Sequence, residues 1–175
     1  MKHKFLLPLF SLFVLGACGV ETDLKQESAN QIARPAFMVE RQIKTDKFEI
    51  AAWERMHLRD SVATIYIEGD NINQIDETHP TLLGQKLPYV NATPNMPLAL
   101  YLASRDKSKN VAHLARPCQY LKMPEEKGCD KSYWVENRYA PEVIAAYEQA
   151  LNDIAARNDI TAFHLVGYDG GANIA

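Results

Sequence analysis

A single acidic side chain, Asp169, stands near the carboxyl end of the chain within the run Gly167-Tyr168-Asp169-Gly170-Gly171. An apolar run that ends at Val166 comes directly before it. Small residues at this spacing suit a sharp strand-to-helix turn, because the central residue there adopts a strained backbone conformation and a Cβ on its flanks would collide. We therefore expect Asp169 to project above one edge of a sheet, where a carboxylate can serve as a nucleophile.

This run resembles the nucleophile elbow, Gly-x-Ser-x-Gly, of the α/β-hydrolase superfamily, with Asp169 at the nucleophile position and Gly167 and Gly171 as its frame. Two further stretches, residues 66–70 and 114–120, are similar to an exported branch of that superfamily. The resemblance implies an oxyanion hole formed by the backbone N–H groups of about Asp70 and Gly170. Taken without the resemblance, the segment around Asp70 fits a plain turn better.

Aspartate in place of serine changes the reaction that the resemblance implies. Haloalkane dehalogenases and epoxide hydrolases use an elbow aspartate to attack carbon, and a histidine-activated water then hydrolyses the resulting ester. The hydrolase order places the acid and the histidine after the nucleophile, whereas this sequence continues for six residues beyond Asp169. Of the earlier histidines we keep only His79, in a long loop, as a candidate, and we expect His164, within a strand, to be a core residue.

Three functional hypotheses follow. The chain is a truncated or degenerate hydrolase-like protein with little or no turnover by itself. It is a working ester or related hydrolase that missing carboxyl-terminal sequence, or a partner chain that completes the sheet, makes whole. It is an envelope binding module that keeps a pocket for a small ester-like molecule without catalysis. We expect no cofactor and no metal site, because no histidine or cysteine stands at ligand spacing around the later cysteines.

Residues 1–17 have the pattern of an export signal. Lys2 and Lys4 precede an apolar run that is too short to span a bilayer. The run ends Leu-Gly-Ala before Cys18, which resembles a bacterial lipoprotein signal cleaved before a cysteine that carries lipid. The alternative is an ordinary signal peptide. Because Gly19 is not acidic, the resemblance to lipoproteins favours an outer-membrane anchor that faces the periplasm.

Composition limits the partners further. The formal net charge of −3 becomes more negative when the two lysines of the signal are removed, which argues against nucleic acid and leaves membrane binding to the lipid on Cys18. We interpret residues 18–35 as a flexible tether and residues 36–175 as one domain. In an oxidising compartment Cys118 and Cys129 are expected to form a disulfide, with two free thiols as the alternative.

Hydrophobic periodicity predicts an α/β fold. Alternation over residues 37–43 and 48–55 indicates an antiparallel hairpin, and residues 61–67, 110–115 and 160–166 are typical of further strands. Helices are expected over residues 96–104 and from Pro141 to about Asn158. This order predicts a mostly parallel sheet with helices on both faces, equivalent to the amino-terminal part of a truncated α/β-hydrolase fold. Such a half-sheet should expose the edge of its central strand, which enters the Asp169 turn, and the apolar face meant for the missing helices. The chain should therefore aggregate or associate.

Overall fold

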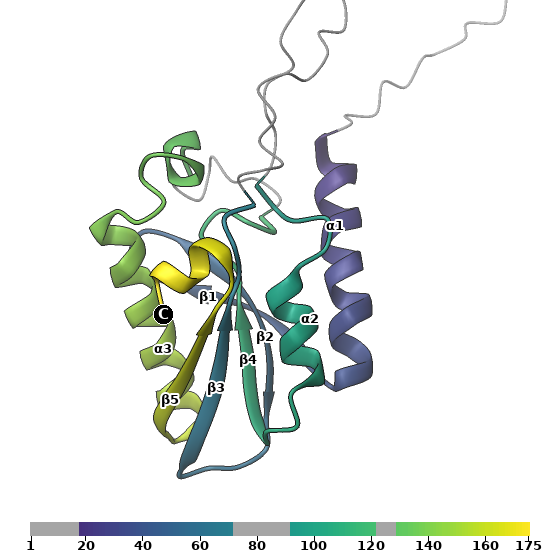
Figure 1. The fold of residues 1–175 in the computed structure, drawn as a ribbon, viewed down its shortest axis with the longest axis vertical. Helices are drawn as coiled ribbons and strands as arrows, with labels where there is room; N and C mark the ends of the chain where they lie inside the picture. Colours follow the sequence, from purple (N-terminus) through teal and green to yellow (C-terminus); the bar gives the residue numbers. More distant parts are fainter. Residues whose placement is uncertain (1–17, 72–91, 122–128) are drawn as a thin grey trace, which may run out of the picture.

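The computed structural model describes residues 18–71, 92–121 and 129–175, which are built around one five-stranded sheet (Figure 1). The strands are β1 (Val39–Lys44), β2 (Glu49–Met56), β3 (Ser61–Ile67), β4 (Asn110–Leu114) and β5 (Ile160–Gly167), in the spatial order β1-β2-β4-β3-β5. Strand β2 runs antiparallel to both of its neighbours, whereas β4, β3 and β5 run parallel. The α/β class and the antiparallel first hairpin are confirmed, and the sheet is mixed.

The hairpin between β1 and β2 is closed by a side chain as well as by the backbone. Thr45 N–H donates to the Phe48 carbonyl at 2.8 Å, and Thr45 Oγ1 accepts from Phe48 N–H at 3.0 Å. This turn sets a register in which Ile43 lies opposite Ile50, so both apolar side chains face the same side of the sheet and enter the core.

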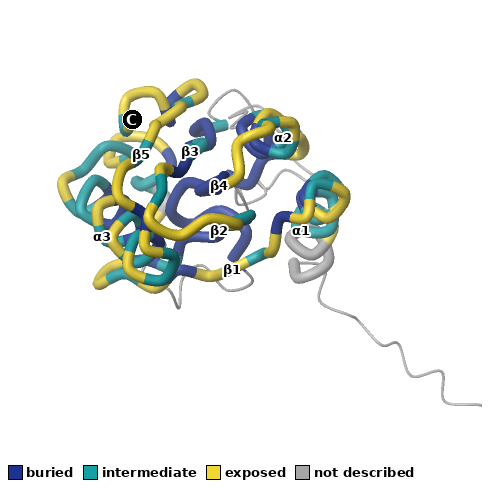
Figure 2. The backbone as a smooth tube through the Cα atoms, turned by 90° about the horizontal axis from the view of Figure 1, so that it is seen from below, coloured by how far each residue is buried: buried dark blue, intermediate teal, exposed yellow. Residues whose placement is uncertain are grey.

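Helices cover both faces of the sheet, as expected. Helix α3 (Pro141–Asn158) lies against one face, while α1 (Cys18–Ala33) and α2 (Leu98–Arg105) lie against the other (Figures 1 and 2). Short 3₁₀ segments η1 (Arg34–Ala36), η4 (Lys131–Trp134) and η5 (Asp169–Asn173) complete the described elements. None of the described helices combines the length and the apolar character needed to cross a membrane.

The core beneath α3 follows the expected helical stripe with one change. Tyr147 and Ile154 are buried on α3, as the periodicity predicts, but Ala146 and Ala150 are buried beside them while Leu151 is only half-buried. Small side chains at these positions let the helix backbone approach the sheet closely. The result is a continuous apolar layer that includes Ile65 and Ile67 of β3.

Helix α1 departs from the expected tether over residues 18–35. Its later part packs against the domain, because Ala29 and Ala33 are fully buried and Asn30 Oδ1 accepts a 2.7 Å hydrogen bond from Trp53 Nε1 on β2. Asn30 Nδ2 also donates to Glu40 on β1 at 3.0 Å. The polar composition that suggests a linker instead supplies side-chain hydrogen bonds, and two alanines are enough to fit the helix onto the sheet.

Two further expectations concern the disulfide and the position of β5 in the sheet. The disulfide between Cys118 and Cys129 is present, with their Cα atoms 5.6 Å apart. It closes a short loop and contributes roughly 3 kcal/mol in the chain-entropy account. The half-sheet interpretation expects the strand that enters the Asp169 turn to have an exposed edge, and β5 is an edge strand among the described residues, paired on one side with β3.

Candidate functional site

The chain turns sharply after β5. Tyr168 N–H still bonds to the Ile67 carbonyl at 3.0 Å, and the next residue, Asp169, begins the 3₁₀ segment η5. Asp169 has a φ of 49°, in the left-handed region, and its side chain is exposed. A non-glycine residue with this φ is strained by order 1–3 kcal/mol and persists only where its surroundings fix it. The structure therefore places a strained, outward-facing aspartate at the end of a strand.

The glycines of the turn are required by close packing. A Cβ on Gly167 would lie 2.3 Å from the Cα of Ala172, within the turn itself. A Cβ on Gly171 would lie 2.3 Å from the carbonyl oxygen of Ile67 on the neighbouring strand. Both obstacles are backbone atoms, which a rotamer change cannot move. The expected collision of any larger residue at the frame of Asp169 is thus present in the structure.

The loop after β3 lies against this turn. A Cβ on Gly170 would lie 1.8 Å from Oδ2 of Asp70, and a Cβ on Gly69 would lie 2.9 Å from the Cβ of Asp169. Because β3 and β5 are parallel neighbours, their carboxyl ends meet at one edge of the sheet. The two residues that the resemblance assigns to an oxyanion hole, Asp70 and Gly170, are therefore in contact.

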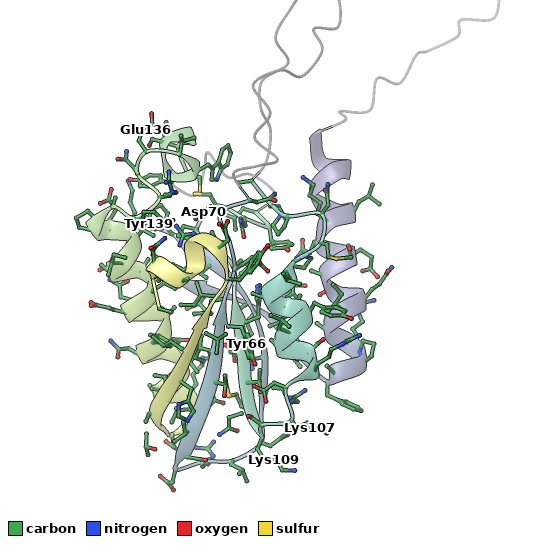
Figure 3. All side chains as sticks on the ribbon, in the orientation of Figure 1. Tyr66, Asp70, Lys107, Lys109, Glu136 and Tyr139 are labelled. Atoms are coloured by element: carbon green, nitrogen blue, oxygen red, sulfur yellow. A yellow bond between two sulfur atoms is a disulfide. The ribbon has the colours of Figure 1, made fainter. Side chains whose placement is uncertain are left out.

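The Asp70 side chain is buried and ionically paired. Its Oδ1 lies 2.9 Å from Nε of Arg116, whose side chain is also buried, and its Oδ2 lies 3.3 Å from Nε of Arg138. The Tyr139 hydroxyl donates to Oδ2 at 2.8 Å and accepts from Asn173 Nδ2 at 3.1 Å. Figure 3 shows Asp70 and Tyr139 at the end of the sheet where β5 turns, opposite the end that carries Lys107 and Lys109.

Arg138 interacts electrostatically with both carboxylates of the site. Its pKa is raised chiefly by its hydrogen bond with the Tyr139 side chain, with further contributions from the negative charges of Asp70 and Asp169. The site therefore contains two acidic and two basic side chains within one electrostatic network. Because Asp70 and Arg116 are both buried, removing Asp70 would leave the Arg116 guanidinium without its carboxylate partner in a poorly solvated place.

A second buried layer supports the loop from below. Gln119, which is fully buried, donates from Nε2 to the Gly69 carbonyl at 3.1 Å and accepts from Arg116 N–H at 3.1 Å. Glu68 lies 3.1 Å from Nε2 of the buried His113 and accepts from Gly69 N–H at 3.1 Å. These contacts hold the peptide that precedes Asp70 from two directions, so the loop is fixed rather than merely folded over the sheet edge.

Backbone strain gathers at the same edge. Asn71, Cys118 and Tyr120 have positive φ values of 57°, 73° and 58°, and all three leave the carboxyl ends of β3 or β4. Bulky residues in this region are uncommon, and such residues concentrate at binding and catalytic sites. Burial raises the pKa of the Tyr120 hydroxyl well above its usual value, and the nearby Glu68 adds to this effect.

The structure brings several sequence-predicted residues together and leaves others apart. The turn residues Asp169, Gly167, Gly170 and Gly171 lie together with Asp70 at one edge of the sheet. His164 is exposed on β5, so the expectation of a core position is wrong, because the face of β5 on which it lies is not covered by a described helix. His79 lies outside the described residues, and Cys18 is the first residue of α1.

The basic side chains of the site were missed from sequence alone. Arg116 could have been suspected, since it directly follows a strand at the same edge. Arg138 and Tyr139 lie in an irregular segment before α3, where no periodic pattern marks them. Only the three-dimensional structure shows that they lie near Asp70, because about seventy residues separate them from it in the sequence.

Comparisons of this chain with protein-family models, with curated proteins and with solved structures give no match. Within the part of the chain that the structure describes, no group of three His, Cys, Asp or Glu side chains could hold a metal ion.

Proposed function

We propose that this chain is an α/β-hydrolase-like lipoprotein of the cell envelope that carries aspartate at the nucleophile-elbow position and does not turn over esters by itself. The observation that carries the proposal is the glycine-framed bend, with Asp169 exposed at a φ of 49° beside the loop that follows β3. A strand, a strained turn, a helical segment and a neighbouring loop at the oxyanion position are the structural context that the elbow motif needs.

The surroundings of Asp169 argue against turnover. An acyl-transfer or alkyl-ester mechanism needs a histidine to activate the nucleophile or the water. Among the described histidines, His113 is buried against Glu68, and His57 follows β2 rather than the β5 turn. His164 lies within β5, in register with Thr64, and not at the carboxyl end of the strand. The charged group that acts on Asp169 is instead Arg138. An exposed carboxylate would also repel an oxyanion that develops beside it.

An ester assay tests the proposal directly. The purified chain is incubated with a short-chain p-nitrophenyl ester, and nitrophenolate release is compared with that of the Asp169→Ala variant. We expect the two rates to be equal. Asp159→Ala is the matched control, because Asp159 also has a positive φ, 53°, but lies at the opposite end of β5. Turnover that Asp169→Ala abolishes and Asp159→Ala preserves would contradict the proposal.

The envelope assignment is supported by the signal-like residues 1–17 and by Cys18 at the point where α1 begins. It is tested by metabolic labelling with radioactive palmitate in a bacterial host, followed by membrane fractionation. We expect label on the chain and its recovery in the outer-membrane fraction. A Cys18→Ser variant should lose the label, and a labelled Cys18→Ser variant would contradict acylation at this residue.

A further inference from the structure

The outer edge of β5 carries few of the features that normally keep an edge strand unpaired. Its register with β3 shifts once, at Thr161, and is regular over residues 162–167. Residues 160–167 contain no Asp, Glu, Lys, Arg or Pro, and the backbone of β5 is paired with β3 on one side only among the described residues. Natural sheets protect such edges with charges, proline or bulges, because an open row of N–H and C=O groups recruits another strand. The regular uncharged stretch over residues 162–167 is long enough to do so.

Apolar side chains flank this edge on both faces. Leu165 and Val166, on opposite faces of β5, are each 37% exposed, and Tyr168 is 44% exposed. On the neighbouring strand Val62, which lies beside Ala162 in the register, is 39% exposed. Covering these side chains would add burial of apolar surface to the backbone hydrogen bonds of strand pairing.

We propose that two copies of this chain associate by antiparallel pairing of their β5 strands about a twofold axis. A second copy suits this edge because an uncharged strand meets no like charge when it pairs with itself. The twofold axis stands normal to the sheet, so directly opposed residues share a face. Centring the pair on His164 opposes Phe163 with Leu165 and Ala162 with Val166, and it keeps the carboxylate of Asp159 outside the paired segment.

The other edge of the sheet makes this association stop at two copies. Strand β1 carries Glu40, Arg41 and Lys44, and Glu40 is held by Asn30 of α1. Self-pairing of β1 would oppose these charges and disturb their partners. The uncharged β5 edge and the charged β1 edge therefore give a closed, isologous dimer with a continuous sheet and not an open fibre.

Sedimentation equilibrium across a wide range of concentrations tests the proposal. We expect the wild-type chain to be a dimer and Val166→Lys to be a monomer, because a lysine at the paired edge would meet an apolar neighbour and lose hydration. The matched control is Gln42→Lys on β1, which should remain a dimer. Thermal unfolding confirms that each variant is folded. A monomeric wild type, a dimeric Val166→Lys variant, or wild-type species larger than a dimer would overturn the proposal.

Disulfide trapping tests the register without relying on a destabilising change. In a Cys18→Ser background, His164→Cys should form an intermolecular disulfide on mild oxidation, since two opposed residues bring their Cβ atoms within about 4.5–5.5 Å. Thr161→Cys is the control and should not crosslink, because Thr161 lies at the register shift, outside the paired residues 162–166. Crosslinking at Thr161, or its absence at His164, would overturn the proposed pairing.

Discussion

The two edges of the sheet are built in contrasting ways. On β1, charged side chains are tied to their surroundings, as Arg41 lies 3.2 Å from the buried Glu54 and Glu40 bonds to α1. On β5, the strand itself is uncharged, and the nearest ion pair is the exposed one between Arg59 and Asp159. Strand β1 therefore carries the charges that normally keep an edge strand from pairing with a further strand. The uncharged edge leads directly into the Asp169 turn, so the candidate site and the proposed interface belong to the same element.

The largest effect is expected where β5 ends. Gly171→Ala places a Cβ against the backbone oxygen of Ile67, so the turn must move away from β3. We expect the free energy of unfolding, measured by urea titration, to fall by about 3 kcal/mol. Gly69→Ala is the milder comparison, because its nearest obstacle is the Cβ of the exposed Asp169 at 2.9 Å, whereas Gly171→Ala meets a backbone oxygen at 2.3 Å. An equal loss in both variants would show that the turn is not packed against the strand as described.

A smaller loss in the free energy of unfolding is expected near β1, the charged edge of the sheet. The Glu54 carboxylate is buried and accepts from both Nη atoms of Arg157, at 2.8 and 3.0 Å. Glu54→Gln removes the charge but keeps the shape, and we expect a loss of about 2 kcal/mol. Arg41→Ala should cost much less, since that guanidinium is half-exposed. If Glu54→Gln is neutral at low ionic strength, the β1 side is not held by this pair.

A pH effect is expected on the β5 side, where Tyr66 lies beside Val166 in the register. Burial, followed by its hydrogen bond to Asp106, raises the pKa of Tyr66 to about 12. As the pH rises above 10, the unfolded chain loses this proton while the folded chain keeps it, so the free energy of unfolding falls. Burial gives Tyr147 a pKa of about 12 as well.

Unfolding by denaturant at several values between pH 10 and pH 12 measures this fall. Tyr66→Phe should make the fall shallower, and the remaining slope should come mainly from Tyr147 and Tyr120. An unchanged slope in Tyr66→Phe would mean that this hydroxyl titrates alike in the folded and unfolded chains.

The smallest effect is expected at the amino end of β5. Arg59 and Asp159 form an ion pair whose side chains are 72% and 46% exposed, so solvent screens their attraction. Arg59→Ala should change the free energy of unfolding by less than about 0.5 kcal/mol. A loss comparable to that of Glu54→Gln would remove the contrast between the two edges.

Local patterns predicted most of the fold. Period-two alternation placed β1 and β2, and the glycine spacing around Asp169 predicted a strained turn whose frame admits no Cβ. Other features depended on three-dimensional neighbours. The polar sequence of α1 shows no apolar stripe, yet its buried Ala29 and Ala33 pack against the domain. Strand order is equally invisible in a single sequence, so the position of β4 between β2 and β3 was not predicted.

The candidate site shows the same division between features that local patterns predict and features that depend on three-dimensional neighbours. The contact between Asp70 and Gly170 followed from the parallel strands that carry them, because both residues leave neighbouring carboxyl ends. The pairing of Asp70 with Arg138 and Tyr139 did not, since those residues come from an irregular segment with no repeating signal. Sequence spacing therefore predicted the backbone of the site better than its electrostatics.

A double-mutant cycle between Asp70 and Gly170 tests the central claim, that the aspartate turn is packed against the loop after β3. The free energies of unfolding of the wild type, Gly170→Ala, Asp70→Ala and the double variant are compared. The account predicts that the added Cβ costs at least about 1 kcal/mol more when Asp70 is present, because it would lie 1.8 Å from Oδ2. Equal costs in the two backgrounds, within about 0.3–0.5 kcal/mol, would show that the two residues do not touch.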